Sequence, residues 1–165
     1  MPSGCSIVRL RPADWQRFRV IRLRALRESP EAFGSTLEEE QNLTDTDWPD
    51  RLARPEVATF VARATDQTDV GLAVGAPYDD EAGLYAMWVA PEARGTGIGS
   101  ALIDAVIAWA SEIGHTKILL DVGDHNAPAI ALYERNGFKA TGRAGALPPP
   151  RIAITEHQRM LVLKL

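Results

Sequence analysis

The pattern of hydrophobic and polar residues along this chain predicts strands and helices in a mixed order. Short segments in which apolar and β-branched residues alternate with polar ones, or run together, are expected to be strands: residues 6–10, 58–64, 70–76, 84–89, 117–122, 138–143 and 157–165. Segments in which apolar residues recur at helical spacing are expected to be helices: residues 14–29, 46–54, 98–114 and 126–137. A run of three strands therefore follows two helices, and the second part of the chain alternates helix and strand.

The connections between these elements predict the fold class. Residues 84–89 are apolar on both faces, which is typical of a central strand covered on two sides. The helix at 98–114 leads from this strand to residues 117–122, and a helical crossover joins parallel neighbours. A polar hairpin loop is expected at 77–83. We therefore expect an α/β (α+β) fold: a mixed, mostly antiparallel sheet of six or seven strands with a central parallel pair, flanked by about four helices.

Length, composition and charge narrow the class of protein. The chain has 165 residues, of which 45% are hydrophobic and 24% charged, values typical of one globular domain spanning residues 1–165. Its net charge of −4 disfavours a nucleic-acid binder, and no apolar run has the length of a membrane span. No secretory signal is visible at the N-terminus, and Cys5 is the only cysteine. We therefore expect a cytoplasmic protein that acts on small molecules.

A glycine-rich turn lies between the strand at 84–89 and the helix that starts near residue 98. Three glycines in five positions let an anion approach the main chain without meeting a Cβ atom: Gly95, Gly97 and Gly99. Arg94 adds a planar cation beside them. The spacing differs from the dinucleotide motif G-x-G-x-x-G, and no lysine follows the last glycine as a P-loop requires. A coenzyme with a diphosphate is therefore expected on the first turn of this helix.

Two motifs in this region resemble those of one enzyme superfamily. The first is R-x-x-G-x-G, which runs from Arg94 to Gly99. The second is N-x-x-A-x-x-L-Y-x-x-x-G-F, which is filled by Asn126, Ala129, Leu132, Tyr133, Gly137 and Phe138. With this order and spacing, the chain resembles the GCN5-related N-acetyltransferase (GNAT) superfamily, closely over residues 84–142 and more loosely elsewhere. The resemblance implies the fold of that superfamily and acetyl coenzyme A (acetyl-CoA) as the acyl donor.

The resemblance also implies roles for individual residues. Main-chain N–H groups around Met87 to Val89 would hold the thioester carbonyl, and Tyr133 would donate a proton to the leaving sulfur. The full set implied to bind the coenzyme is Met87, Trp88, Val89, Arg94, Gly95, Thr96, Gly97, Ile98, Gly99, Ser100 and Asn126.

Three of these assignments have structural alternatives. Tyr133 lies at a helical position where an aromatic residue also packs against the central helix. Asn126 can cap the helix that follows it, which does not prevent contact with the coenzyme. Arg94 can pair with Glu92 or Glu112 on the surface. The sequence leaves these alternatives open.

The sequence does not assign the general base. The carboxylate that the superfamily often places on the strand before the glycine-rich turn is absent, and Tyr85, Met87 and Trp88 occupy that strand. Carboxylates that act through water are left as alternatives: Asp121, Glu81 and the run Glu38 to Glu40, which is otherwise interpreted as a solvated face. His125 is expected to face solvent. No cluster of His, Cys, Asp and Glu has metal-ligand spacing, so no metal is expected.

The leading hypothesis is an N-acetyltransferase that moves acetyl from acetyl-CoA to a primary amine of a small molecule, by direct attack through a tetrahedral intermediate. One alternative is acetylation of a protein N-terminus or lysine. Another is a module that binds acyl-CoA without catalysis, which the absent carboxylate favours. A homodimer formed through Trp88, Trp109 or the last strand is compatible with the sequence, which does not decide the matter.

Overall fold

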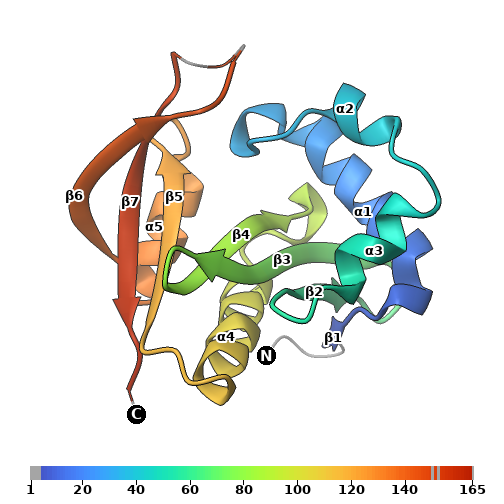
Figure 1. Cartoon of the computed structure of the whole chain (residues 1–165), viewed down its shortest axis with the longest axis horizontal. Coiled ribbons are helices and arrows are strands. Elements are labelled where there is room, and N and C mark those ends of the chain that lie inside the picture. Colours follow the sequence, from blue (N-terminus) through green and yellow to red (C-terminus); the bar gives the residue numbers. More distant parts are fainter. Residues whose placement is uncertain (1–4, 150, 152, 165) are drawn as a thin grey trace.

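The computed structural model describes residues 5–149, 151 and 153–164 (Figure 1). The strands are β1 (Ser6–Arg9), β2 (Ala58–Arg63), β3 (Asp69–Tyr78), β4 (Glu81–Val89), β5 (Lys117–Gly123), β6 (Lys139–Ala146) and β7 (Thr155–Val162). The helices are α1 (Trp15–Glu28), α2 (Leu37–Gln41), α3 (Asp47–Ala53), α4 (Ile98–Glu112) and α5 (Ala127–Arg135). Among these described helices, none is long and apolar enough to cross a membrane.

The seven strands form one sheet in the order β1-β2-β3-β4-β5-β7-β6. Every neighbouring pair is antiparallel except β4 and β5, which run parallel. The chain passes between these two strands through α4, as the crossover predicts. The fold class expected from the sequence is therefore confirmed, and α2 adds a fifth helix to the four expected.

The parallel pair separates soon after it forms. β4 and β5 are paired at Ala82↔Ile118 and Gly83↔Leu119, and their described residues pair no further. Beyond Gly83, a bulge interrupts the pairing of β4 with β3, and Ala86 takes a left-handed conformation with φ of 55°. The remaining lengths of β4 and β5 diverge toward their carboxyl ends, and Figure 1 shows β4 turning away from β5. This opening is where the candidate site lies.

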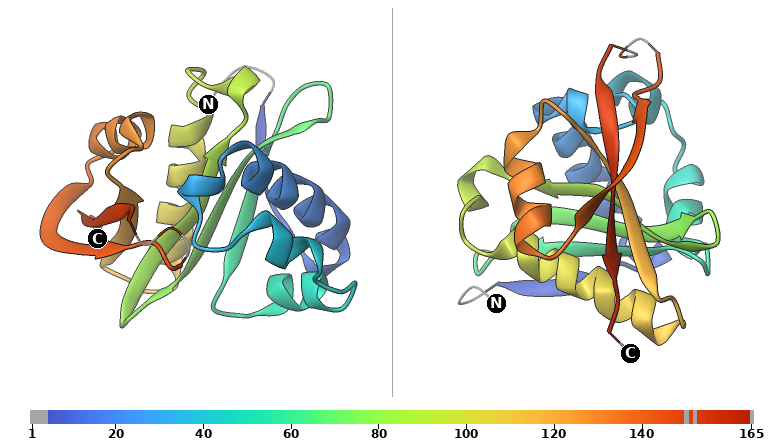
Figure 2. Two further views of the ribbon diagram at one scale, coloured as in Figure 1. Left: turned by 90° about the horizontal axis from the view of Figure 1, so that it is seen from above. Right: turned by 90° about the vertical axis from the view of Figure 1, so that its left-hand side faces the viewer.

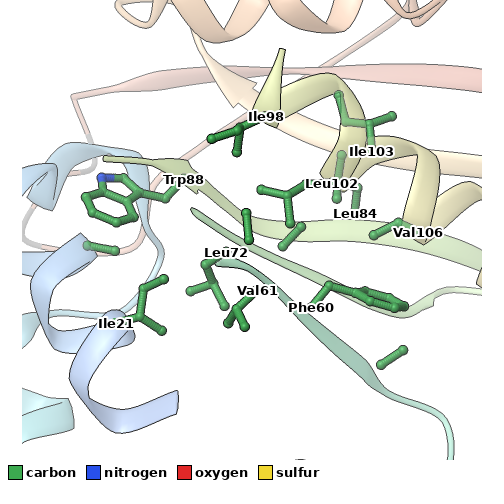
Figure 3. Packing of buried hydrophobic residues seen from close by; sticks show 14 of the residues in the cluster. Ile21, Phe60, Val61, Leu72, Leu84, Trp88, Ile98, Leu102, Ile103 and Val106 are labelled. Atoms are coloured by element: carbon green, nitrogen blue, oxygen red, sulfur yellow. The ribbon is translucent and has the colours of Figure 1, made fainter. Parts of the chain in front are cut away.

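Helices cover both faces of the sheet. α1 packs against β3 from one face, and α4 packs against β2, β3 and β4 from the other, as Figure 2 shows. The hydrophobic core lies between them, and Figure 3 shows residues of α1, three strands and α4 that build it: Ile21, Phe60, Val61, Leu72, Leu84, Trp88, Ile98, Leu102, Ile103 and Val106. Trp88 and Trp109 are both buried in this core, so neither is exposed for a dimer contact.

Two glycines of β3 allow α4 to lie close to the sheet. A Cβ atom on Gly75 would lie 2.5 Å from the ring of Trp109, and one on Gly71 would lie 2.8 Å from Leu102. Gly75→Ala is therefore expected to lower the free energy of unfolding by about 1–3 kcal/mol, because the ring has no room to move in a packed core. Urea unfolding measures the change. Gly145→Ala is the control, since its Cβ would meet no described atom within 4 Å; equal stability of the two variants would contradict the close packing.

The boundaries of several elements differ from those expected. The loop predicted at 77–83 is a turn of Asp79 and Asp80, because cross-strand pairing extends β3 and β4 through polar residues that favour a turn on composition alone. β6 extends to Ala146, and β7 begins at Thr155. The last residue of the strand expected at 157–165 lies outside the described residues, as does the third proline of the triplet at 148–150.

Candidate active site

Two cavities meet where β4 and β5 separate. The first, of about 680 Å³, lies between the end of β4, the start of α4 and α5. The second, of about 480 Å³, lies between the same part of β4, the carboxyl end of β5, helices α1 and α3, and the segment that leads into β7. Among the described residues, three line both cavities: Ala32, Met87 and Asn126. Ligands in the two cavities would therefore meet at this shared wall.

The first cavity faces the start of α4. Gly97 immediately precedes the helix, and Gly95 and Gly97 have φ angles of 77° and 88°, which favour glycine. The hydrogen bond from Ala101 N–H to Gly97 O (3.1 Å) opens the helical ladder. The N–H groups just before Ala101 have no acceptor within the helix, and they carry the partial positive charge of the helix end. This arrangement is suited to binding an anion.

Most residues expected to bind a coenzyme line the first cavity: Met87, Trp88, Val89, Arg94, Gly95, Gly97, Gly99, Ser100 and Asn126. Two others are not among its described lining residues. The Thr96 hydroxyl donates to Ala93 O (2.5 Å), and Ile98 is buried in the core, so these side chains serve the turn and the packing. Gly99 also serves packing, because a Cβ atom there would lie 2.9 Å from Leu132 of α5.

Arg94 and Glu28 form an ion pair at the edge of the first cavity. Arg94 Nη2 lies 2.9 Å from Glu28 Oε2, and Arg94 Nε donates to Val89 O (2.9 Å). Glu28 also accepts hydrogen bonds from Trp88 Nε1 (2.8 Å) and from the hydroxyl of Ser29. Burial raises the pKa of Glu28, but the hydrogen bonds from these three donors outweigh burial and hold that pKa below its usual value. Glu28 is therefore a carboxylate at neutral pH.

This partner of Arg94 differs from both surface alternatives. Glu92 pairs with Arg24 (2.7 Å), and the described residues show no ion pair between Arg94 and Glu112. Sequence reasoning missed Glu28 because it lies 66 positions before Arg94, at the end of α1. The Arg94 side chain is 49% exposed, so its guanidinium has room for a second anion.

Asn126 caps α5 at the wall that the two cavities share. Its Oδ1 accepts a hydrogen bond from Ala129 N–H (3.3 Å), which confirms the helix cap considered from the sequence. The same residue lines both cavities, so capping and contact with a ligand are compatible. His125 beside it is exposed, as expected, and lines the first cavity.

Tyr133 of α5 lines the second cavity. Its side chain is 6% exposed and packs edge-on against Phe138, with ring centroids 5.8 Å apart. Burial raises the pKa of its hydroxyl, so the phenol keeps its proton at neutral pH. Tyr133 therefore belongs to the hydrophobic core, where it packs against Phe138, and it also lines the second cavity.

The structure shows which of the carboxylates considered as the general base line a cavity and which do not. Glu40 is 3% exposed and pairs with Arg22 and Arg51, both at 2.8 Å, so the interpretation of this residue as part of a solvated face is wrong. α2 turns Glu40 toward α1 and α3, where its charge is neutralised. Three others are absent from the described linings of both cavities: Glu38, Glu39 and Glu81. Asp121 lines the second cavity and is the one of these carboxylates found there.

Glu156 is a second carboxylate of this cavity, and the sequence analysis missed it. It lies on β7 opposite Gly123, two register positions from the pair Asp121↔Gln158, and it lines the second cavity. Burial, followed by the charge of Asp121, raises the pKa of Glu156. The available signal was strand alternation: a strand that starts at 155 puts Glu156 and Gln158 on one face.

Arg151 connects two segments at the wall of the second cavity. Its guanidinium donates hydrogen bonds to four main-chain oxygens: Pro30 (2.5 Å), Phe33 (2.5 Å), Gly34 (3.1 Å) and Ser35 (3.5 Å). These bonds join the segment between β6 and β7 to the segment between α1 and α2. Three of the four acceptor residues line the second cavity, so Arg151 holds part of its wall in position.

Comparison with known proteins assigns the family. The model of the acetyltransferase (GNAT) family matches residues 19–138, which is more than half of the chain. A mixed sheet that opens between two parallel strands, beside a glycine-rich helix start, agrees with that match. The chain belongs to the GNAT family, whose acetyltransferases are acyltransferase enzymes.

Individual relatives and solved structures agree with this family. The mycothiol acetyltransferase of Propionibacterium freudenreichii subsp. shermanii is 30% identical over 162 residues, which are 96% of this chain and 50% of that protein. The chain thus spans half the length of that relative. A GCN5-related N-acetyltransferase from Kribbella flavida superposes with a TM-score of 0.73 at 26% identity, covering 99% of this chain and 100% of the other. Spermidine N-acetyltransferase from Vibrio cholerae, solved with CoA and spermine, shares the fold: the TM-score is 0.77 at 16% identity, with 98% and 96% covered.

Proposed function

We propose that this protein is an N-acetyltransferase that transfers acetyl from acetyl-CoA to the primary amine of a small molecule. The observation that carries the proposal is the meeting of two cavities at the split between β4 and β5. The start of α4 faces one cavity, and Tyr133 lines the other. A donor that carries phosphates and an acceptor that carries an amine would each have a cavity, with their reacting ends at the shared wall.

The residues of the first cavity fit a coenzyme with a diphosphate. A Cβ atom on Gly95 would meet no described atom within 4 Å, so its positive φ and the open approach, rather than packing, account for this glycine. Main-chain N–H groups at the start of α4 and the guanidinium of Arg94 would hold the phosphates. Met87 and Leu132 give the cavity an apolar wall on the side of the shared residues.

Acetyl-CoA supplies an acyl group activated as a thioester, and the chain supplies the groups that act on it. Ala86 and Met87 lie in the bulge of β4 and have no cross-strand partner in the described residues of β3 or β5. Their main-chain N–H groups are therefore candidates to stabilise negative charge on the acyl oxygen. Tyr133 holds its proton at neutral pH and is the candidate donor to the leaving sulfur.

A small acceptor is proposed in preference to a peptide. The second cavity, of about 480 Å³, lies within the range of roughly 300–1,000 Å³ that is usual for small-molecule sites. Arg151 ties the segments on two sides of this cavity together, which disfavours an open groove. The name of the mycothiol acetyltransferase similar to this chain also points to a small molecule.

Two measurements test the proposal. Titration calorimetry with acetyl-CoA and CoA is expected to show binding, and a panel of primary amines is expected to include acceptors that release the thiol. Binding without release from any amine or peptide would favour a module that binds acyl-CoA without catalysis. Release with peptides alone would favour a protein acetyltransferase. No binding of either coenzyme form to the folded protein would refute the proposal.

Arg94→Gln is expected to raise the Kd for acetyl-CoA about tenfold, because it removes a charge-assisted hydrogen bond to a phosphate. Titration calorimetry measures the Kd. Arg27→Gln is the matched control, since Arg27 is an exposed arginine of α1 that is absent from the described linings of both cavities. A Kd equal to that of the wild type would mean that Arg94 serves only its ion pair with Glu28.

A further inference from the structure

Acidic and basic residues line opposite sides of the second cavity. Two carboxylates line it on the side of the closing strands, Asp121 of β5 and Glu156 of β7. Three arginines line it on the side of the N-terminal helices: Arg22 of α1, Arg51 of α3 and Arg54, which follows α3. Figures 1 and 2 show that α1 and α3 lie on one side of β4 and that β5 and β7 lie on the other.

Among the described residues, the two carboxylates of the acidic end form no ion pair. Asp121 accepts hydrogen bonds from the neutral hydroxyl of Tyr78 at 3.0 and 2.9 Å. The pKa of Glu156 is raised, first by burial and then by the negative charge of Asp121, although the charges of His125 and Arg151 act in the opposite direction. A cation between the two carboxylates would relieve this repulsion.

The basic end holds more positive charge than its own carboxylate neutralises. Arg22 forms two hydrogen bonds with Glu40, at 3.0 and 2.8 Å, and Arg51 forms one with the same carboxylate at 2.8 Å. One negative charge thus faces two positive charges. Arg54 is exposed and makes no ion pair with the described residues, which adds a further positive charge.

Arg22 gives a second, independent sign of a ligand. The residue is 7% exposed and lines the cavity, yet its Nη1 finds no hydrogen-bond acceptor among the described residues. A buried guanidinium N–H without an acceptor is costly, because its hydration is lost and not replaced. An oxyanion that enters this end of the cavity would supply the acceptor.

We propose that the acceptor is a primary amine that also carries a carboxylate, with its ammonium group at Asp121 and Glu156 and its carboxylate at Arg22, Arg51 and Arg54. This inference rests on the proposed function, whose acceptor class it narrows. The acidic end lies near Asn126 of the shared wall, because Glu156 is paired opposite Gly123 at the end of β5 and Asn126 follows that strand. The carboxylate end selects the acceptor from the far side of the cavity.

Matched acceptors test this inference. A set of α-, β- and ω-aminocarboxylic acids is compared with the methyl ester of each acid and with the amine that lacks the carboxylate, and thiol release gives kcat/KM. The best acid is expected to exceed its ester and its carboxylate-free amine by about 10- to 100-fold, as a hydrogen-bonded charge pair predicts. Equal or higher kcat/KM for the ester or the carboxylate-free amine would overturn the inference.

Variants locate the end that recognises the carboxylate. Arg54→Gln is expected to lower the ratio of the kcat/KM values for acid and ester about tenfold. Arg11→Gln, an exposed arginine absent from the described linings of both cavities, is expected to leave that ratio unchanged. An unchanged ratio in Arg54→Gln would remove this residue from the site.

A binding measurement keeps the inference separate from the proposed function. If no acceptor releases the thiol, acetyl transfer fails, and the acceptor site is then judged by calorimetry with CoA present. The aminocarboxylic acid is still expected to bind at least tenfold more tightly than its ester. Equal binding of the acid and the ester would overturn the inference whatever the enzyme assay shows.

Discussion

Tyr133→Phe is expected to lower kcat for thiol release by about 10²- to 10⁴-fold, with little change in the Kd for acetyl-CoA. The substitution removes only the hydroxyl, because a phenylalanine ring keeps the edge-on packing against Phe138. Burial raises the pKa of Tyr133, so the wild-type hydroxyl is protonated throughout the neutral range and can serve as an acid. The rate of thiol release at saturating substrate measures kcat, and calorimetry measures the Kd.

The control for this prediction is Tyr85→Phe. Tyr85 lines the same cavity, but its hydroxyl donates to Pro77 O (2.9 Å) and serves the β3–β4 hairpin. A change of no more than a few-fold in kcat is expected, in line with a residue outside the proton path. If Tyr133→Phe kept the wild-type kcat while the control behaved as expected, the proton for the sulfur would have to come from another group.

Glu40→Gln is expected to lower the free energy of unfolding by about 3–5 kcal/mol, the usual cost of breaking a buried ion pair by removing one partner. Glu40 is 3% exposed, and its carboxylate lies 2.8 Å from both Arg22 and Arg51. A glutamine leaves two guanidiniums close together without a counter-charge. Urea unfolding at neutral pH measures the loss. Glu38→Gln, an exposed neighbour in α2, is the control and is expected to change stability by less than about 0.5 kcal/mol.

The same carboxylate predicts how stability depends on pH. Burial alone would raise the pKa of Glu40, but hydrogen bonds and charge from Arg22 and Arg51 outweigh burial and lower the pKa to about 2. Because the unfolded chain then binds the proton more readily, this stabilisation is present above about pH 4.5 and is lost as the pH falls toward 2. The contribution of Glu40 ionisation to the free energy of unfolding is roughly 3 kcal/mol. Unfolding of the wild type and Glu40→Gln at pH 7 and pH 3 measures most of this contribution, and a parallel loss in both proteins would contradict the assignment.

Much of the fold could be predicted from the sequence because its signals are local. The β-meander, the crossover helix and the central parallel pair follow from hydrophobic periodicity and from turn residues. The glycine-rich turn is also a local signal, and the structure adds that Gly95 and Gly97 adopt positive φ angles, which glycine tolerates best. The order of strands at the far edge, with β7 between β5 and β6, is a consequence of long-range pairing.

The parts of the site that escaped prediction depend on contacts between distant segments. Glu40 is read from the sequence as one of three exposed acids, and only the approach of α1 and α3 reveals that it is buried. Glu156 becomes a cavity residue only when β7 pairs with β5. The partner of Arg94 likewise lies 66 positions away. Periodicity carries no information on pairings of this range.

The contacts of Arg151 have a consequence for how the acceptor site changes in evolution. The guanidinium grips the main-chain oxygens of residues between α1 and α2, and every amino acid supplies such an oxygen. Side chains along that segment can therefore be substituted without loss of these hydrogen bonds, as long as the backbone keeps its path. Mutations there would alter the preference for one acceptor over another at little cost to folding, which makes this segment the natural place for new specificities to arise.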